Sequence, residues 1–338
     1  MKVGVVVSCY RQERFLARTV AAIETALETA LEERDWQGVL ELAVPSSEPL
    51  PALSDRWRVL SVFDPATRRP GRPLTPGAGR MLGFSACGGD WVLFADSDVE
   101  VEAEWVRAAI ALATRDPDLA AIFGRIDEWF VDGGRERPGQ PDMYRTGDTD
   151  RPVDYLAAVA FYRRSALVAA GGYDERLNSD EDFELGLRLR HRGLAMRSLG
   201  TLAARHWSAP RPTVRELVRR WRTGICFGQG QVLRLYFGRP GFGTLLRRQW
   251  LYVAALGMWT LGIGVSVAAM LAREPRWVAL WALVPLAVLT LMSARKRSLR
   301  RGSLSLLTWT VQGLGLVVGL FRLPDGARPL SPTAEARC

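Results

Sequence analysis

The first half of the chain alternates short apolar runs with segments in which apolar residues recur at helical spacing. Residues 3–8 form a β-branched apolar run that predicts a buried strand, and the spacing of apolar residues over 13–31 predicts a helix. Continued alternation predicts a mostly parallel sheet that is covered by helices on both faces. The further predicted strands are 39–44, 57–63, 91–95 and 120–126, and the further predicted helices are 79–86 and 102–115.

A polar stretch and a second set of helices follow. Residues 132–150 are rich in Gly, Pro, Asp and Arg and lack hydrophobic periodicity, which predicts a long loop that acts as a lid. Short helices are predicted at 165–170 and 181–192, each followed by glycine, and a strand is predicted at 199–205. Apolar residues and arginines mix over 213–236, which predicts one amphipathic helix at a membrane interface.

Three apolar stretches dominate the end of the chain. Residues 250–271 contain no charged residue, and spanning a bilayer takes about 20 residues. The second stretch, 277–294, carries Pro285, while 304–320 includes Gln312 and several glycines. We predict that the first two stretches are transmembrane helices and that the third either spans the membrane or is re-entrant. Core helices of a soluble protein rarely contain two such runs joined by so short a turn.

Charge supports a membrane location. The net charge is +9, no nucleic-acid-binding motif is present, and we therefore expect no nucleic acid partner. Arginines 247 and 248 precede the first apolar stretch, and five cations lie within 295–301 after the second. This bias predicts the inner (cytoplasmic) membrane of the cell, with the amino-terminal domain in the cytoplasm. The apolar run at 1–8 is too short for a signal peptide, and the scattered cysteines predict neither a zinc site nor a disulfide framework.

Two carboxylates follow the predicted strand 91–95. Asp96 and Asp98 are placed at the carboxyl edge of the sheet, where ligands bind in open α/β folds. Hard oxygen ligands suit Mg²⁺ or Mn²⁺ and leave coordination positions for diphosphate oxygens. Taken alone, an Asp-x-Asp pattern after a strand is more often a turn or a helix cap than a metal site. Residues 179–182 are also open to two interpretations, a capping box or a rigid support for a reactive carboxylate, and the two are compatible.

The order and spacing of several motifs resemble glycosyltransferase family 2, over about residues 1–235. The resemblance implies an α/β GT-A domain, with the Rossmann-like mixed sheet of nucleotide-diphospho-sugar transferases, followed in this chain by C-terminal transmembrane helices. It also implies an inverting enzyme that uses a nucleotide-diphosphate sugar. The motifs are the run from Val5 through Leu16, Asp96-Ser97-Asp98, Gly171-Gly172-Tyr173-Asp174, and Glu181-Asp182-Phe183-Glu184-Leu185 with Arg188.

The resemblance also implies roles for the matching carboxylates. Asp98 is similar to the direct ligand of Mg²⁺ or Mn²⁺, and Asp96 to a carboxylate near the nucleotide ribose or the metal. Asp182, the second acid of the catalytic pair that begins at Glu181, is similar to the general base. In such a site the metal neutralises charge on the departing diphosphate, and the base accepts the proton of the acceptor hydroxyl.

Several positions are candidates on weaker grounds, and some depart from the family pattern. Ser8 stands where the family usually has proline, and 45–48 replaces acidic residues that recognise uracil and ribose. Leu217 replaces the glutamine of the processive signature before Arg220, which favours a single addition of sugar. His206 is either a third metal ligand or diphosphate contact, or a loop residue stacked near Trp207. The candidate nucleotide contacts are Tyr10, Glu13, Glu48, Arg80, Asp96 and Arg220.

These patterns predict four segments: a GT-A domain at 1–212, an amphipathic interfacial region at 213–245, a transmembrane region at 246–322 and a tail at 323–338. The expected function is inverting transfer of one sugar from a nucleotide-diphosphate sugar to a hydroxyl of a lipid-borne or polysaccharide acceptor at the cytoplasmic membrane face. Two alternatives are a polyprenyl-phosphate glycosyltransferase and a non-catalytic membrane adaptor that has lost donor binding. A nucleotidyltransferase is disfavoured because its glycine-rich, lysine-bearing amino-terminal loop is absent.

Overall fold

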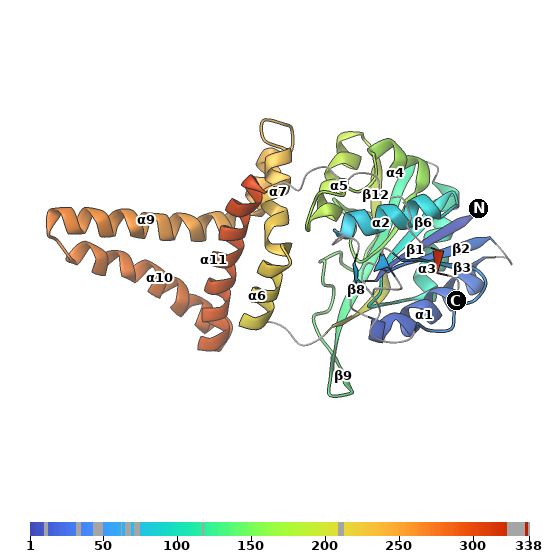
Figure 1. Ribbon diagram of the computed structural model, residues 1–338, viewed down its shortest axis with the longest axis horizontal. Coiled ribbons are helices and arrows are strands. Elements are labelled where there is room, and N and C mark those ends of the chain that lie inside the picture. The colour runs from blue at the N-terminus through green and yellow to red at the C-terminus, as the bar shows by residue number, and fades with distance from the viewer. Residues whose placement is uncertain are drawn as a thin grey trace. The chain divides into compact units, whose positions relative to one another are not determined.

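The chain folds into two compact units in a computed structural model (Figure 1). The first unit contains Met1–Leu177, Glu181–Pro210 and Pro324–Cys338, and the second contains Asn178–Asp180 and Arg211–Leu323. The residues that the structure describes are 1–9, 13–31, 35–42, 50–61, 63–64, 69–70, 75–116, 118–208, 213–322 and 335–336.

An eleven-stranded mixed sheet forms the centre of the first unit. Its strands are β1 Val3–Cys9, β2 Trp36–Leu42, β3 Trp57–Ser61, β6 Trp91–Asp96, β7 Val99–Val101, β8 Leu119–Asp132, β9 Arg135–Pro138, β10 Arg151–Pro152, β11 Val159–Arg163, β12 Ala195–Ser208 and β13 Glu335–Ala336. Their order is β10-β12-β8-β11-β6-β1-β2-β3-β13, with β7 on β12 and β9 on β8. The strands β6, β1, β2 and β3 are mutually parallel, so their carboxyl ends share one edge.

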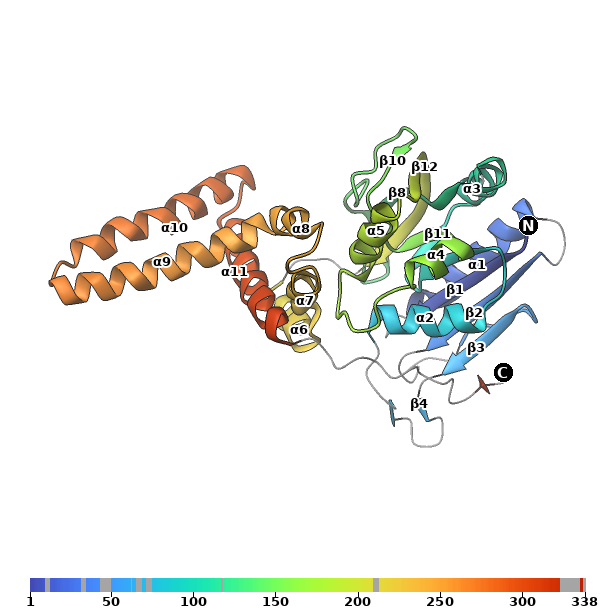
Figure 2. The same ribbon diagram turned by 90° about the horizontal axis from the view of Figure 1, so that it is seen from above.

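Helices cover both faces of this sheet, as the pattern predicted. They are α1 Glu13–Ala30, α2 Pro76–Ala86, α3 Ala103–Arg115, α4 Arg164–Ala170 and α5 Glu181–His191. In both views α1 and α3 lie on one face, and α2, α4 and α5 lie on the other (Figures 1 and 2). Val5, Val6 and Val7 of β1 are fully buried, as expected for a strand with helices on both sides.

The strands β8 and β12 are longer than the apolar pattern predicted, because their polar ends pair with each other. Arg205 of β12 lies opposite Asp127 of β8 in this parallel ladder. The predicted loop 132–150 is partly wrong, since it contains β9, which forms a hairpin with β8. The next turn is held by Asp142, whose carboxylate accepts hydrogen bonds from the backbone N–H groups of Thr146 and Gly147, both at 2.8 Å.

The prediction of one continuous helix over 213–236 is wrong. The second unit instead has α6 Val214–Arg222, a short 3₁₀ helix η1 Ile225–Phe227, and α7 Gly228–Leu235. Gly224 adopts φ 78°, which a helix interior does not permit. Segment Asn178–Asp180 supports the break, because Asn178 Nδ2 donates to Gly224 O at 3.4 Å and Ser179 Oγ donates to Ile225 O at 2.8 Å. Periodicity along one segment does not reveal these partners.

Three further helices of the second unit are long and apolar enough to cross a membrane. They are α9 Trp250–Ala272, α10 Arg276–Arg295 and α11 Leu299–Phe321, and the short α8 Phe242–Arg248 precedes them. The helices α9 and α10 form a hairpin in which Trp259 packs against Trp281, with ring centroids 5.8 Å apart. In both views α11 runs across this hairpin rather than alongside it (Figures 1 and 2).

Glycines bring α11 close to η1 and α7. A Cβ added at Gly319 would lie 2.0 Å from the carbonyl oxygen of Phe227, and one added at Gly230 would lie 2.0 Å from that of Leu316. Gly315, four residues before Gly319, makes a similar approach to Cys226. Small residues four positions apart commonly allow such backbone contact between helices in membranes. Packing at these glycines therefore fixes α11 against α7.

Substitution Gly230→Ala should destabilise the second unit, because the new methyl group meets a backbone carbonyl rather than a flexible side chain. We expect a loss of about 1–3 kcal/mol, measured as a lower melting temperature of the detergent-solubilised protein. The matched control is Gly257→Ala in α9, where an added Cβ meets nothing within 4 Å. Equal melting temperatures for the two variants would contradict this account of the packing.

Candidate functional site

Asp96 and Asp98 lie at the shared carboxyl edge of the parallel strands. The strand β6 ends at Asp96, and Asp98 follows in a tight turn before β7. Two hydrogen bonds fix this turn: Ser97 N donates to Ser8 O at 3.2 Å, and Thr19 Oγ1 donates to Ser97 O at 2.9 Å. Asp98 is 2% exposed. The sheet and α1 therefore hold both carboxylates.

His206 faces the Asp98 carboxylate. Its Nε2 lies 3.5 Å from Asp98 Oδ2, and the backbone N–H of Trp207 donates to Asp98 O at 2.8 Å. The interpretation of His206 as a loop residue is wrong, because it lies within β12, opposite Val99 of β7. Pairing of β7 with β12 thus brings together two side chains that are far apart in the sequence.

Several buried polar atoms near this edge have no hydrogen-bond partner among the residues that the structure describes. They include the hydroxyls of Ser8 and Ser97 and Nδ1 of His206. Buried polar atoms are normally paired, so such a group marks a candidate ligand site. Within the described parts of the chain, no set of three or more His, Cys, Asp or Glu side chains is arranged to hold a metal ion. The local donor pair is Asp98 with His206.

A buried arginine joins the acidic residues of this edge. Arg80 of α2 donates through Nη2 to Asp96 Oδ1 at 2.9 Å and through Nη1 to Glu181 Oε1. Nη1 also lies 3.6 Å from Asp182 Oδ1. Burial alone would lower the pKa of Arg80, but the charges of Asp182, Asp96 and Glu181 raise that pKa well above its usual value. A permanent positive charge therefore connects α2, β6 and the start of α5.

The two acids at the start of α5 differ in environment. Glu181 is buried against Arg80, whereas the Asp182 side chain retains 18% exposure. Asp180, directly before them, adopts φ 63°, a left-handed conformation that is uncommon for residues other than glycine. Asp182 is therefore the more accessible carboxylate for an incoming group.

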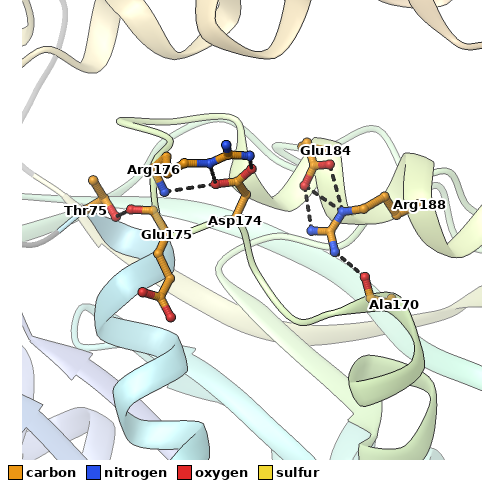
Figure 3. Close-up of polar contacts among 7 residues, drawn as sticks. All are labelled: Thr75, Ala170, Asp174, Glu175, Arg176, Glu184 and Arg188. Atoms are coloured by element: carbon orange, nitrogen blue, oxygen red, sulfur yellow. Dashed lines mark hydrogen bonds and ion pairs between the residues drawn. The ribbon is translucent and has the colours of Figure 1, made fainter. Parts of the chain in front are cut away.

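Ion pairs and hydrogen bonds of side chains hold the loop between α4 and α5 (Figure 3). Arg188 donates to both carboxylate oxygens of Glu184, at 2.7 and 2.6 Å, and to the carbonyl oxygen of Ala170 at the end of α4. Asp174 accepts from Arg176 Nε at 2.9 Å and Nη2 at 2.6 Å. These contacts fix both ends of the segment that leads toward α5.

Known proteins with similar sequence bear on this site. The model for Glycosyl transferase family 2 matches residues 66–168. A pre-mycofactocin glycosyltransferase of Mycobacterium tuberculosis is 31% identical over 132 residues, which are 36% of this chain and 28% of that protein. Residues 66–168 of this chain are thus similar to glycosyltransferase family 2. It spans little more than a quarter of the length of the curated relatives that it matches.

Solved structures show the same fold. The mannosyltransferase PcManGT of Pyrobaculum calidifontis, in complex with GDP-Man and Mn²⁺, aligns with a TM-score of 0.57 at 16% identity, over 96% of this chain and 88% of that chain. S. aureus TarS 1-349, in complex with UDP-GlcNAc, aligns with a TM-score of 0.50 at 15% identity, over 92% of this chain and 90% of that chain. At such identities the likeness concerns the fold alone, and it confirms the predicted GT-A fold.

Tyr144, which lies within the residues that the family model matches, was not among the predicted site residues. Burial raises the pKa of the Tyr144 phenol, and the charges of Asp96 and Asp182 raise it further. These charges act on Tyr144 because the turn held by Asp142 brings it to the acidic edge. The available signal was that Tyr144 is the single aromatic residue of the polar stretch 132–150.

Glu41 was also not among the predicted site residues. It is 1% exposed within β2, and its Oε1 has no hydrogen-bond partner among the described residues. Burial raises the pKa of Glu41 from 4.5 to about 8, although nearby Arg80 acts to lower it. A lone carboxyl inside the apolar run 39–42 was the signal that could have revealed it.

The structure does not test the remaining predicted contacts. Tyr10 and Glu48 lie outside the described residues, as does the side chain of Glu13. Arg220 belongs to the second unit, on α6, where its Nε lies 3.2 Å from Glu216 Oε1. Of the predicted site residues, the structure therefore joins Arg80, Asp96, Glu181 and Asp182 in one cluster, and Asp98 with His206 in an adjoining pair.

The substitution Glu41→Gln should remove a pH-dependent loss of stability. The folded state keeps the Glu41 proton up to pH about 8, whereas the unfolded chain releases it near 4.5, so stability falls as pH rises between these values. The slope is at most about 1.4 kcal/mol per pH unit. We expect the variant to melt at a higher temperature than the wild type at pH 8, with the difference shrinking toward pH 5.

Glu28→Gln, on the exposed face of α1, is the matched control and should leave the pH profile of the melting temperature unchanged. A Glu41→Gln profile parallel to that of the wild type over the whole range would refute the assignment of a neutral, buried carboxyl.

Proposed function

We propose that this chain transfers a single sugar from a nucleotide-diphosphate sugar to an acceptor hydroxyl, with inversion at the sugar carbon. The observation that carries the proposal is the arrangement at the sheet edge, where the Asp98–His206 pair adjoins the cluster held by Arg80. The family 2 match supports sugar transfer. Structural neighbours in complex with UDP-GlcNAc, or with GDP-Man and Mn²⁺, support a nucleotide-sugar donor and a divalent metal.

The residues at this edge fit a divalent cation. Asp98 supplies a hard carboxylate oxygen and His206 an imidazole nitrogen, with Asp96 two residues from Asp98. Mg²⁺ and Mn²⁺ sites commonly combine one or two carboxylates with substrate phosphates, so two protein ligands leave coordination positions for a diphosphate. When bound, the metal would neutralise charge on the departing nucleoside diphosphate.

Asp182 is suited to act as the general base. As the acceptor oxygen bonds to the sugar carbon and the bond from that carbon to the diphosphate breaks, the Asp182 carboxylate accepts the hydroxyl proton. Arg80 orients this carboxylate, since its guanidinium lies 3.6 Å away. Glu181, buried against the same guanidinium, acts as a positioning residue.

Loss of the Asp98 carboxylate or of the Asp182 carboxylate should reduce sugar transfer. We expect Asp98→Asn and Asp182→Asn each to lower turnover by a factor on the order of 10² or more. Transfer of radiolabelled sugar from nucleotide sugars to membrane lipid extract, with added Mn²⁺ or with chelator, is the measurement. Asp90→Asn, just before the start of β6 and so at its opposite end, is the control. The Asp90 side chain accepts a hydrogen bond from Lys2 N at 3.1 Å in an exposed position, and normal turnover is expected.

The outcomes separate the alternatives. An Asp98→Asn protein that works at full rate in chelator would overturn the metal site. A mild effect of Asp182→Asn alone would favour a polyprenyl phosphate acceptor, because an anionic oxygen needs no base. Failure to bind any nucleotide sugar would favour the adaptor, for which Ser8 and the altered residues 45–48 are the motivation.

The proposed acceptor is lipid-borne or a polysaccharide, and the proposed location of the domain is the cytoplasmic face of the inner membrane. In this arrangement α9 and α10 cross as a hairpin and α11 runs along the membrane surface. The support is that Glu335–Ala336 pairs with β3, so the chain leaves the first unit before α6 and returns to it after α11. Such a return requires an even number of crossings. The cations of 295–301 then lie inside, in line with the charge bias.

Cysteine labelling would test this topology. In a background with the four native cysteines replaced by serine, Glu274→Cys, in the turn between α9 and α10, should react with an impermeant maleimide added outside intact cells. Arg322→Cys, after α11, should react only once the membrane is permeabilised. Labelling of both from outside would mean that α11 crosses the membrane as a third span.

A further inference from the structure

A basic cleft lies where α10 ends and α11 begins, entirely within the second unit. Its volume is about 710 Å³. Three of its lining residues are cations, two carry hydroxyls, and one is a tryptophan. The lining residues are Arg295, Lys296, Arg301, Leu304, Ser305, Thr308 and Trp309.

Hydrogen bonds organise the cationic side of this cleft. Lys296 Nζ donates to Ser305 Oγ at 2.5 Å, and Ser305 Oγ donates in turn to Arg301 O at 2.9 Å. Ser298 caps α11 by accepting from Arg301 N at 3.3 Å. Lys296 is thereby held against the first turns of α11, whose amino-terminal end carries the positive pole of the helix dipole.

No acidic residue balances these cations locally. The sequence contains no Asp or Glu from Pro275 to Leu323. Among the residues that the structure describes, no ion pair is formed by Arg295, Lys296 or Arg301. Three uncompensated positive charges around one cleft favour an anion, and the fork of Arg301 matches phosphate oxygens in two-point contacts.

The surroundings point to a lipid as the source of that anion. Both helices that meet at the cleft are long and apolar enough to cross a membrane. Trp309 and Leu304 line the wall beside the cations. An indole next to basic side chains is typical of the level at which headgroups meet acyl chains, and basic pockets between membrane helices bind anionic headgroups.

We propose that the cleft lined by Lys296, Arg301 and Trp309 binds the phosphate of a membrane lipid. Arg301 and Lys296 contact the phosphate oxygens, and Trp309 packs against the glycerol or the first isoprenoid carbons. An anionic phospholipid and a polyprenyl phosphate both present this chemistry. The cleft belongs to the second unit alone, and lipid binding in it does not depend on sugar transfer by the first unit.

Lipid binding to the full chain tests the site. The detergent-solubilised protein is titrated with phosphatidylglycerol or undecaprenyl phosphate, with phosphatidylcholine as reference lipid, and bound lipid is counted by native mass spectrometry. We expect retention of one anionic lipid and an affinity about tenfold weaker in the double variant Lys296→Gln/Arg301→Gln, because two charged contacts are lost. The control Arg297→Gln/Arg300→Gln removes the same charge from the same turn outside the lining and should change affinity by less than about threefold.

The arms of the experiment give distinct results. Tighter binding of undecaprenyl phosphate than of phosphatidylglycerol, or the reverse, supports the site and identifies which lipid class supplies the phosphate. Equal losses of lipid affinity in the two double variants would mean that the lipid is attracted only by the overall positive charge, which would overturn the proposal. Binding of phosphatidylcholine as tight as that of the anionic lipids would also overturn it. Displacement of the lipid by inorganic phosphate at equal concentration would overturn the proposal that the bound phosphate belongs to a lipid. Unchanged melting temperatures of both variants show that any loss is not due to misfolding.

Discussion

The buried guanidinium of Arg80 is the interaction on which the candidate active site depends. Asp96, Glu181 and Asp182 come from two elements far apart in the sequence, and their negative charges would repel one another at such short range. One permanent cation among them converts repulsion into attraction. Removing one partner of a buried ion pair is strongly destabilising, so the identity of residue 80 constrains both α2 and α5.

The cluster around Arg80 is held in position by contacts among residues that take no part in the proposed reaction. The Glu184–Arg188 and Asp174–Arg176 pairs fix the loop before α5, and the hydroxyl of Thr75 donates to the carbonyl of Glu175 at 2.6 Å (Figure 3). The next segment, Asn178–Asp180, is held by the second unit, and the chain then enters α5 directly. This segment, which hydrogen bonds join to the helices of the second unit, therefore leads directly into the helix that carries the proposed base.

The second unit follows a different physical rule. Its helices expose large apolar side chains along their length, and α10 has no buried residue at all. Burial of apolar surface within the protein thus contributes little to holding α10, whereas α11 is held by close backbone approach at Gly315 and Gly319. The charged residues of α10 and α11 lie at the helix ends, where the basic cleft is found.

The sequence by itself determined those features that local pattern controls. The buried strand β6, the Asp96–Asp98 pair after it, the helix that begins at Glu181, and the apolar helix α9 all follow from periodicity and from residues that are adjacent in the chain. A strand or helix in an apolar environment has a run or a periodic pattern of apolar residues in its own sequence. These elements could therefore be predicted before any partner was known.

Only the tertiary structure decided which distant residues meet. It extended β8 and β12 through polar ends that pair with each other, divided the segment 213–236 at Gly224, and placed His206 against Asp98. It also gave Arg80 three acidic neighbours and buried Glu41, one of whose oxygens has no hydrogen-bond partner in the described parts of the chain. Polar groups pair when they are close in space. A hydrogen bond or ion pair between elements that are remote in the sequence produces no periodic pattern of residues along the chain, so the sequence alone does not predict it.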